Sequence, residues 1–299
     1  MNNINDVQKY YQTIRDRLKN YIKSDYLANS ETLLLYVDDI LGEQCSKYSN
    51  IAREPFIETS ASYKKIIDGI NKSNFIEKEI KESFFKLNRE NIGIFPDPFE
   101  HQLLALENFT IGRDLFVSTG TGSGKTECFL WPIIAKCFKE AKNSPKLFEM
   151  EAVRTLIIYP MNALVSDQLS RFRRIIGNEK FMEVFTNETH ANRIPHFGMY
   201  TGRTPYSGKP DPISNRELAK TFRENYLVDE GESKETQQRQ FNNINGLKSI
   251  YKYPARFGED GLQVFINNLE QNIHKPSPYD AEFITRFEMQ NSPPDILIT

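Results

Sequence analysis

The sequence predicts an α/β fold, with a mostly parallel sheet and helices on both of its faces. Short apolar runs of strand length occur at 114–118, 153–159, 197–200 and 296–298. Segments of helical periodicity lie between these runs. This alternation is typical of parallel sheets, because each parallel connection needs a crossover. A glycine-rich turn follows the first run directly, and we expect that run to be a buried strand.

Composition narrows the class of protein. The chain has 299 residues, a length typical of one or two domains, and 39% of them are hydrophobic. With 38 Lys and Arg against 40 Asp and Glu, the net charge is −2, so a nucleic-acid surface has to be a local patch. Three cysteines without a C-x-x-C pair form no disulfide framework and suit a reducing cytosol. We expect neither a signal peptide nor a membrane helix, and therefore a cytoplasmic protein.

Residues 1–90 have the pattern of an accessory helical region. Apolar residues recur at helical spacing between Val7 and Leu18, and again between Leu33 and Leu41. The pair Asp38-Asp39 resembles the acidic end of a magnesium-binding strand, but the helical spacing continues past it. We therefore place Asp38 and Asp39 in a helix.

The glycine-rich turn has the features of a phosphate-binding loop. It lies between a predicted strand and a helix that begins near Glu127, which Pro132 should kink or interrupt. Glycines let backbone N–H groups surround phosphate oxygens, and the helix N-terminus adds positive charge. Lys125 should reach the β- and γ-phosphates, and the Thr126 hydroxyl should ligate Mg²⁺. The alternative is a turn without a ligand. The nucleotide-binding residues predicted here are Thr119, Gly120, Thr121, Gly122, Ser123, Gly124, Lys125 and Thr126.

This loop resembles that of superfamily 2 helicases of the DEAD/DEAH-box type, which read Ala-x-Thr-Gly-Ser-Gly-Lys-Thr. The match is complete from Thr121 to Thr126, and Thr119 stands where other phosphate-binding loops have glycine. These helicases also carry an aromatic residue and a glutamine about twenty residues earlier. Phe99 and Gln102 fit, since Gln102 lies 23 residues before Lys125 (125 − 102 = 23). The resemblance implies that the Gln102 carboxamide reads adenine, which both donates and accepts. The alternative is an ordinary helix start with a surface glutamine.

Two turns resemble the nucleic-acid contacts of the same helicases. Tyr159-Pro-Met-Asn-Ala-Leu is similar to their motif Ia, and Tyr200-Thr-Gly-Arg-Thr-Pro to a turn on the nucleic-acid side of their sheet. The second could also be a simple turn. Arg171, Arg173 and Arg174 either extend a positive track or form a solvated basic face. The nucleic-acid contacts that the resemblance implies are Pro160, Asn162, Thr201, Gly202 and Arg203.

The resemblance covers roughly residues 95–299. It is strongest to the large bacterial helicases of DISARM-type phage defence and to MrfA-like repair helicases. It implies a first RecA-like domain over 91–299, truncated at its C-terminus, with a polar insertion near 206–250. In this family the acidic Asp-Glu motif and a second RecA-like domain follow later. Asp229-Glu230 comes too early and follows too short an apolar run. We also expect the run 296–298 to lack a partner strand or cover.

The resemblance thus implies an ATP-dependent helicase or translocase that uses ATP and Mg²⁺ but is inactive as this chain alone. Its expected partners are single-stranded or duplex nucleic acid, more consistent with DNA, the remaining helicase domains and other defence proteins, without a membrane. A non-catalytic nucleotide-binding or interaction module is the alternative. A small-molecule kinase would leave Gln102 and the motif Ia turn without a role.

Overall fold

The computed structural model describes residues 2–27, 30–41, 62–120, 122–206, 208–256 and 261–299. The chain divides into two compact units, Met1–Ser62 and Tyr63–Thr299. In the described part of the chain, no helix combines the length and apolar character needed to cross a membrane.

The first unit contains helices α1 (Asn2–Tyr26) and α2 (Glu31–Leu41). Both helices were expected from the periodicity of their apolar residues. Asp38 and Asp39 lie within α2, so the helical interpretation of this pair is confirmed.

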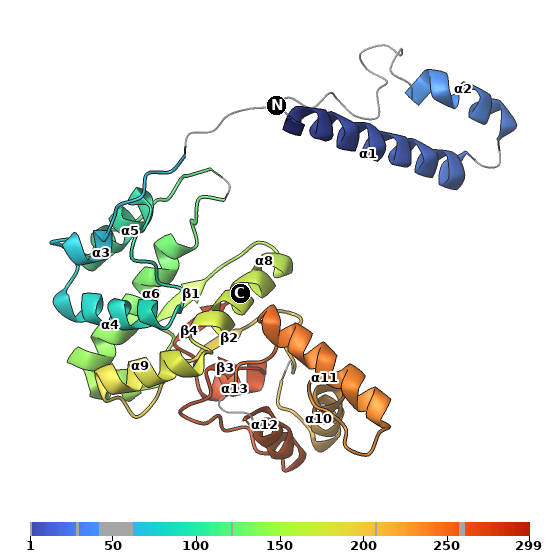
Figure 1. Cartoon of the computed structure of the whole chain (residues 1–299). Helices are drawn as coiled ribbons and strands as arrows, with labels where there is room; N and C mark the ends of the chain where they lie inside the picture. Colours follow the sequence, from blue (N-terminus) through green and yellow to red (C-terminus); the bar gives the residue numbers. More distant parts are fainter. Residues whose placement is uncertain (1, 28–29, 42–61, 121, 207, 257–260) are drawn as a thin grey trace. The chain divides into compact units, whose positions relative to one another are not determined.

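The second unit is built around a parallel sheet of four short strands, with helices around it (Figure 1). The strand order is β1 (Thr155–Ile157), β4 (Ile296–Ile298), β2 (Phe197–Met199) and β3 (Glu282–Phe283). Leu297 is paired with Leu156 on one side and with Gly198 on the other. The predicted α/β class is confirmed.

The position of β4 corrects one expectation. Ile296 and Ile298 were expected to lack a partner strand, but β4 lies between β1 and β2 and both isoleucines are fully buried. The partners come from strands far away in the sequence, which local patterns do not indicate. The edge strands of the sheet are β1 and β3 instead, and at β1 the side chains of Leu156 and of the following Ile158 are 54% and 72% exposed.

The strand expected at 114–118 is also corrected. In the structure these residues form no strand with any described residue, and Phe116 is 95% exposed. An apolar run becomes a strand only when another strand offers its hydrogen-bonding groups. None of the four described strands pairs with this segment.

The helices α3 (Gly69–Lys72) and α4 (Lys78–Arg89) belong to the second unit, although we placed residues up to 90 in the accessory region. The reason is packing, because Ile80, Phe84 and Leu87 are buried in the main core together with Trp131 of α6. The Trp131 indole N–H donates a 3.0 Å hydrogen bond to the Gly93 carbonyl. The remaining helices are α5 (Glu100–Thr110), α6 (Glu127–Asn143), α7 (Pro145–Glu149), α8 (Asn162–Ile175), α9 (Glu179–Thr189), α10 (Pro212–Tyr226), α11 (Lys234–Ser249), α12 (Gly261–Glu270) and α13 (Arg286–Asn291).

The structure shows how two segments whose fold the sequence left open are arranged. Helix α6 continues through Pro132 to Asn143 instead of ending in its first turn. The polar insertion near 206–250 forms α10 and α11; α11 is largely exposed, whereas α10 packs on α12 through a small second core that includes Ala219, Phe265 and Ile266.

A buried ion cluster holds the start of β4. Asp295, 1% exposed, accepts hydrogen bonds from the guanidinium groups of Arg193 and Arg154 at 2.7–2.8 Å. It also accepts one from the His196 backbone N–H at 2.8 Å. The cluster therefore ties together the residues just before β1, β2 and β4.

Candidate nucleotide and nucleic-acid sites

The glycine-rich turn lies directly before α6 and adopts the backbone that only glycines readily allow. Gly122 and Gly124 have φ values of +76° and +74°. A Cβ on Gly124 would lie 2.4 Å from the Gln102 amide nitrogen, so a side chain does not fit there. A Cβ on Gly122 would meet nothing within 4 Å, which leaves open space beside the loop. This geometry fits a phosphate cradle.

Lys125 lies over this loop. Its Nζ donates 2.7 Å hydrogen bonds to the carbonyls of Thr119 and Gly120. The Thr119 and Ser123 hydroxyls are hydrogen-bonded to each other at 2.6 Å. Thr126 directly precedes the first residue of α6, which suits a hydroxyl that would ligate a metal beside the phosphates. Thr121 lies outside the described residues.

Gln102 joins α5 to the loop. Its side chain is buried, with Oε1 accepting from the Phe99 N–H at 2.9 Å and Nε2 donating to the Gly124 carbonyl at 3.1 Å. Both ends of the carboxamide are therefore engaged within the protein, each with one further bond to offer. The structure thus places Gln102 against the loop and Phe99 beside Gln102, and their contact with a nucleotide stays a prediction.

Two neighbouring aromatic residues were missed. The His101 Nε2 lies 2.8 Å from the Ser123 carbonyl, and its ring is stacked with Phe99 at 5.7 Å. The Tyr63 ring lies 5.3 Å from His101. The sequence carries no signal for either contact, since histidine and tyrosine occur in many environments and Tyr63 is far from the loop in sequence.

The first residues of α6 carry no nucleophile. Burial, with the nearby Glu127 carboxylate, raises the pKa of the Cys128 thiol to about 11, so it stays protonated near pH 7. The Glu127 Oε2 is buried and has no hydrogen-bond partner among the residues that the structure describes, and the Glu127 Oε1 lies 3.7 Å from Arg171. Arg173 forms a buried ion pair with Glu282 and therefore has a structural role in the core.

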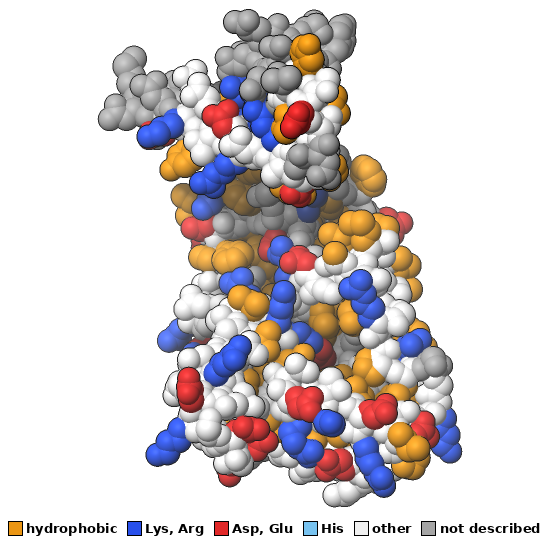
Figure 2. All heavy atoms as spheres, turned by 90° about the vertical axis from the view of Figure 1, so that its right-hand side faces the viewer, with side chains coloured by type: hydrophobic (Ala, Val, Ile, Leu, Met, Phe, Trp, Pro, Cys, Tyr) orange, Lys and Arg blue, Asp and Glu red, His pale blue; other side chains and the backbone are white. Residues whose placement is uncertain are grey.

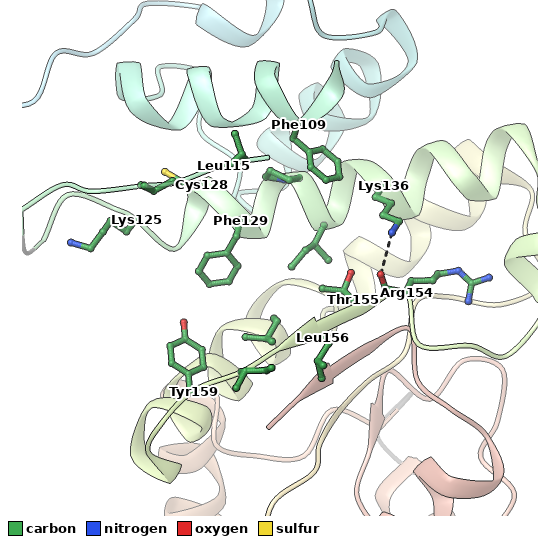
Figure 3. Close-up of a pocket in the computed structure, with 15 residues that line it drawn as sticks. Phe109, Leu115, Lys125, Cys128, Phe129, Lys136, Arg154, Thr155, Leu156 and Tyr159 are labelled. Carbon is green, nitrogen blue, oxygen red and sulfur yellow. Dashed lines mark hydrogen bonds between the residues drawn. The ribbon is translucent and has the colours of Figure 1, made fainter. Parts of the chain in front are cut away.

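An open groove separates the loop and α6 from the free edge of β1 (Figure 3). Its volume is about 660 Å³. Phe129 lies on the α6 side, and Leu156 and Tyr159 on the β1 side. The Lys136 Nζ spans one end of the groove with a 3.1 Å bond to the Arg154 carbonyl. Its remaining lining includes Leu115 and Val117 of the segment before the loop.

The five predicted nucleic-acid residues follow two strands of the same sheet, β1 and β2. Pro160 and Asn162 follow β1 and are exposed, and Asn162 is the first residue of α8. Gly202 and Arg203 are exposed in the turn after β2, where the Thr201 hydroxyl accepts from the Arg203 N–H at 3.2 Å. Only β4 separates β1 from β2, and all three strands are parallel. The two turns therefore share the carboxyl edge of the sheet, where open α/β sheets bind ligands.

Charge on the surface is mixed. Figure 2 shows Lys and Arg side chains interspersed with Asp and Glu over the face it presents. Among the described residues, no group of three or more His, Cys, Asp or Glu could hold a metal ion. Asp229 and Glu230 are exposed in the turn between α10 and α11.

Comparison with known proteins shows which proteins the chain is similar to. Residues 99–199 match the family model of DEAD/DEAH box helicases. Druantia protein DruE of Escherichia coli (strain UMEA 4076-1) is 32% identical over 308 residues, which cover 96% of this chain and 16% of that protein. The chain thus spans about a sixth of the length of this relative. No solved structure matches the chain. The matched region contains the phosphate-binding loop, Gln102, the motif Ia turn and strands β1 and β2, and over this region the chain is similar to the DEAD/DEAH box helicases.

Proposed function

We propose that the chain is the ATP-binding part of an ATP-dependent nucleic-acid helicase or translocase. The observation that carries the proposal is the junction of Gln102 with Gly124, which holds a base-reading carboxamide against a loop shaped for phosphates. ATP has both an adenine base for the Gln102 carboxamide and phosphates for the loop. DEAD/DEAH box helicases in general use ATP with Mg²⁺.

The residues present fit a bound Mg–ATP. Lys125 would exchange its bonds to the Thr119 and Gly120 carbonyls for the β- and γ-phosphates, which carry more negative charge. Thr126 would give its hydroxyl to Mg²⁺. When bound, the ion would neutralise charge that develops on the phosphates.

Nucleic acid is the proposed partner at the carboxyl edge of the sheet. Arg203 is exposed there, in the turn after β2. Backbone N–H groups at the start of α8, beside Asn162, suit a phosphate. These contacts would bind a single strand with little sequence preference, because phosphates carry no sequence information. Because the sequence resembles helicases of phage defence, the proposal includes that the protein acts in phage defence together with other defence proteins.

We further propose that residues 1–299 alone do not hydrolyse ATP at a useful rate. Phosphoryl transfer needs an acid to hold Mg²⁺ and position water, and an arginine to stabilise charge. By the family resemblance, the Asp-Glu motif that supplies this acid comes after the segments that match here, and Asp229-Glu230 is exposed in the turn between α10 and α11. The groove between Val117 and Leu156 has room for a further segment that would bring such an acid, and the free edge of β1 offers hydrogen bonds to it.

The experiment has two steps. The first is calorimetric titration of the 299-residue chain and its Lys125→Ala variant with Mg–ATP. The variant loses a charge-assisted contact of about 1.5–3 kcal/mol, and equal affinities would contradict nucleotide binding at this loop.

The second step is steady-state phosphate release with saturating single-stranded DNA. It compares the 299-residue chain with a chain extended by the segment that follows in the gene. We expect turnover only in the extended chain. Binding without turnover in both would favour a non-catalytic nucleotide-binding module, and fast turnover by residues 1–299 would show that they already hold the magnesium acid.

A further inference from the structure

A second cavity, of about 340 Å³, lies between the end of α8, the start of α9 and residues 248–256. It is at the amino edge of the sheet, because Arg173 near the end of α8 is paired with Glu282, the first residue of β3. The proposed nucleic-acid turns follow the opposite, carboxyl ends of the strands. The lining includes Arg173, Arg174, Lys248, Tyr251, Tyr253 and Arg256.

One buried ion pair holds the wall of this cavity in place. The Arg173 guanidinium donates to the two carboxylate oxygens of Glu282 at 2.6 and 2.7 Å, and to the Lys252 carbonyl at 3.0 Å. The same carboxylate accepts from the Ala255 backbone N–H at 2.8 Å. Residues 252–255 are therefore fixed against the end of α8, and the cavity exists without a ligand to assemble it.

Two exposed basic side chains of the lining lie over aromatic rings. The Arg174 Cζ is 5.7 Å from the ring centroid of Tyr251, and the Lys248 Nζ is 4.9 Å from that of Tyr253. A ring attracts a cation but does not neutralise its charge. Among the described residues of the lining, Glu179 is the only acid, so positive charge is in excess.

A further basic side chain of the lining is buried. Arg256, whose side chain is 2% exposed, donates through its two terminal nitrogens to Asp280 at 2.8 Å and to Glu288 at 2.6 Å. The Arg256 Nε–H is buried and has no acceptor among the residues that the structure describes. An unsatisfied buried donor is costly, so this group favours a ligand that brings hydrogen-bond acceptors.

We propose that this cavity binds the phosphate group of a small ligand, at a site separate from the glycine-rich loop. A phosphate brings negative charge and acceptor oxygens, which match the two ring-held cations and the unused Arg256 donor. The volume falls within the range of about 300–1,000 Å³ typical of small-molecule sites. The ring of Tyr251 is 41% exposed and would cover a substituent on the phosphate. The inference stands apart from the proposed function, since it needs no nucleotide at Lys125.

The test uses inorganic phosphate, adenosine monophosphate and adenosine as probes in calorimetric titrations. The parent protein is the 299-residue chain with Lys125→Ala, so that the lysine of the glycine-rich loop does not contribute. Arg174→Ala and Lys248→Ala are each added to this parent and remove one cation of the cavity. The matched control is Lys252→Ala, at an exposed lysine of the same segment that is not among the described lining residues.

Inorganic phosphate and adenosine monophosphate should each bind the parent, whereas adenosine should not. Arg174→Ala and Lys248→Ala should each weaken both phosphate ligands by about tenfold, because a charge-assisted hydrogen bond to the phosphate is lost. Lys252→Ala should match the parent. Tighter binding of adenosine monophosphate than of phosphate would support a nucleotide as the ligand, and equal affinities would support a site for the phosphate group alone.

A parent that binds neither phosphate ligand overturns the inference. Losses in Arg174→Ala and Lys248→Ala no larger than in Lys252→Ala also overturn it, because a general effect of surface charge would explain them. A loss of single-stranded DNA affinity in Arg174→Ala, with phosphate binding unchanged, would assign the cavity to nucleic acid and equally overturns it. Thermal melting of each variant shows that the comparison is made between folded proteins.

Discussion

The side-chain nitrogen of Gln102 lies 3.1 Å from the backbone carbonyl of Gly124 and donates a hydrogen bond to it. The other end of the same carboxamide accepts from the Phe99 backbone. One buried side chain thus joins the start of α5 to the phosphate-binding loop. A base that forms a hydrogen bond with Gln102 is therefore bound by the same side chain that helps to determine the shape of the loop.

Replacement of Gln102 by Ala should reduce ATP affinity more than GTP affinity, because the N6/N7 edge of adenine donates and accepts, as a carboxamide does, whereas the O6/N7 edge of guanine only accepts. It should also destabilise the fold by about 1–3 kcal/mol, since a buried N–H and a carbonyl lose their partner. Competition binding and urea unfolding measure the two effects. The control is Gln168→Ala, another buried glutamine, on α8, which should leave the ATP-to-GTP ratio unchanged. Equal losses for both nucleotides would contradict a base-reading role.

The triple variant Asn162→Ala, Thr201→Ala and Arg203→Ala should lose most single-strand binding, whatever the sequence of the oligonucleotide. Affinity of the wild type should fall steeply with salt, because phosphate contacts release counterions. Fluorescence anisotropy at several salt concentrations measures both effects, and Arg203→Ala alone should reduce the salt slope by about one. Arg174→Ala, an exposed arginine in the last turn of α8 that lies over the Tyr251 ring, is the control. A flat salt dependence would argue against this site.

Stability should depend on pH through His196. Burial lowers the pKa of this histidine from 6.5 to about 4, so the unfolded chain binds the proton more readily. The contribution of the neutral ring is present above pH 6.5 and is lost as the pH falls toward 4. Full loss corresponds to about 3 kcal/mol. Urea unfolding between pH 4 and 7 should show a steep slope for the wild type and a shallower one for His196→Gln.

The matched control is His190→Asn, at an exposed position whose left-handed backbone asparagine tolerates. Its slope should equal that of the wild type. A slope in His196→Gln as steep as in the wild type would assign the pH dependence to other groups.

Replacement of Asp295 by Asn should destabilise the second unit by about 3–5 kcal/mol, because it leaves the buried Arg193 without its negative partner and Arg154 with Glu140 alone. Urea denaturation at pH 7 measures the change. The control is Asp167→Asn, an exposed residue paired with Arg171, which should stay within about 0.5 kcal/mol of the wild type. A loss below about 1 kcal/mol would mean that the asparagine amide satisfies both arginines.

The parts of the molecule that depend on neighbours in sequence could be predicted. The turn at 119–126, the helix after it and the position of Gln102 follow from spacing within some 25 residues, and the structure brings Gln102 to the loop. Likewise, the helix around Asp38 follows from its own periodicity.

What sequence reasoning missed depends on groups that are distant in sequence. A three-residue strand such as β4 has no periodicity of its own to show that it is central, and Leu115 looks like a strand residue although no described strand pairs with it. Asp295 resembles any loop aspartate until Arg193 and Arg154 are placed around it. Tyr63 falls in a region that we had assigned to another part of the chain.

The central place of β4 determines when the sheet can form during synthesis. β1 and β2 emerge from the ribosome long before β4, yet they are not hydrogen-bonded to each other. They stand two strand spacings apart, roughly 9–10 Å, across the position that β4 will occupy. A nascent chain that stops short of residue 296 thus contains three of the four strands but only the pairing of β2 with β3. Until Ile296–Ile298 are synthesised, the backbone hydrogen-bonding groups of β1 and of one side of β2 have no partner strand. A chaperone that covers these groups would act for longest during this interval.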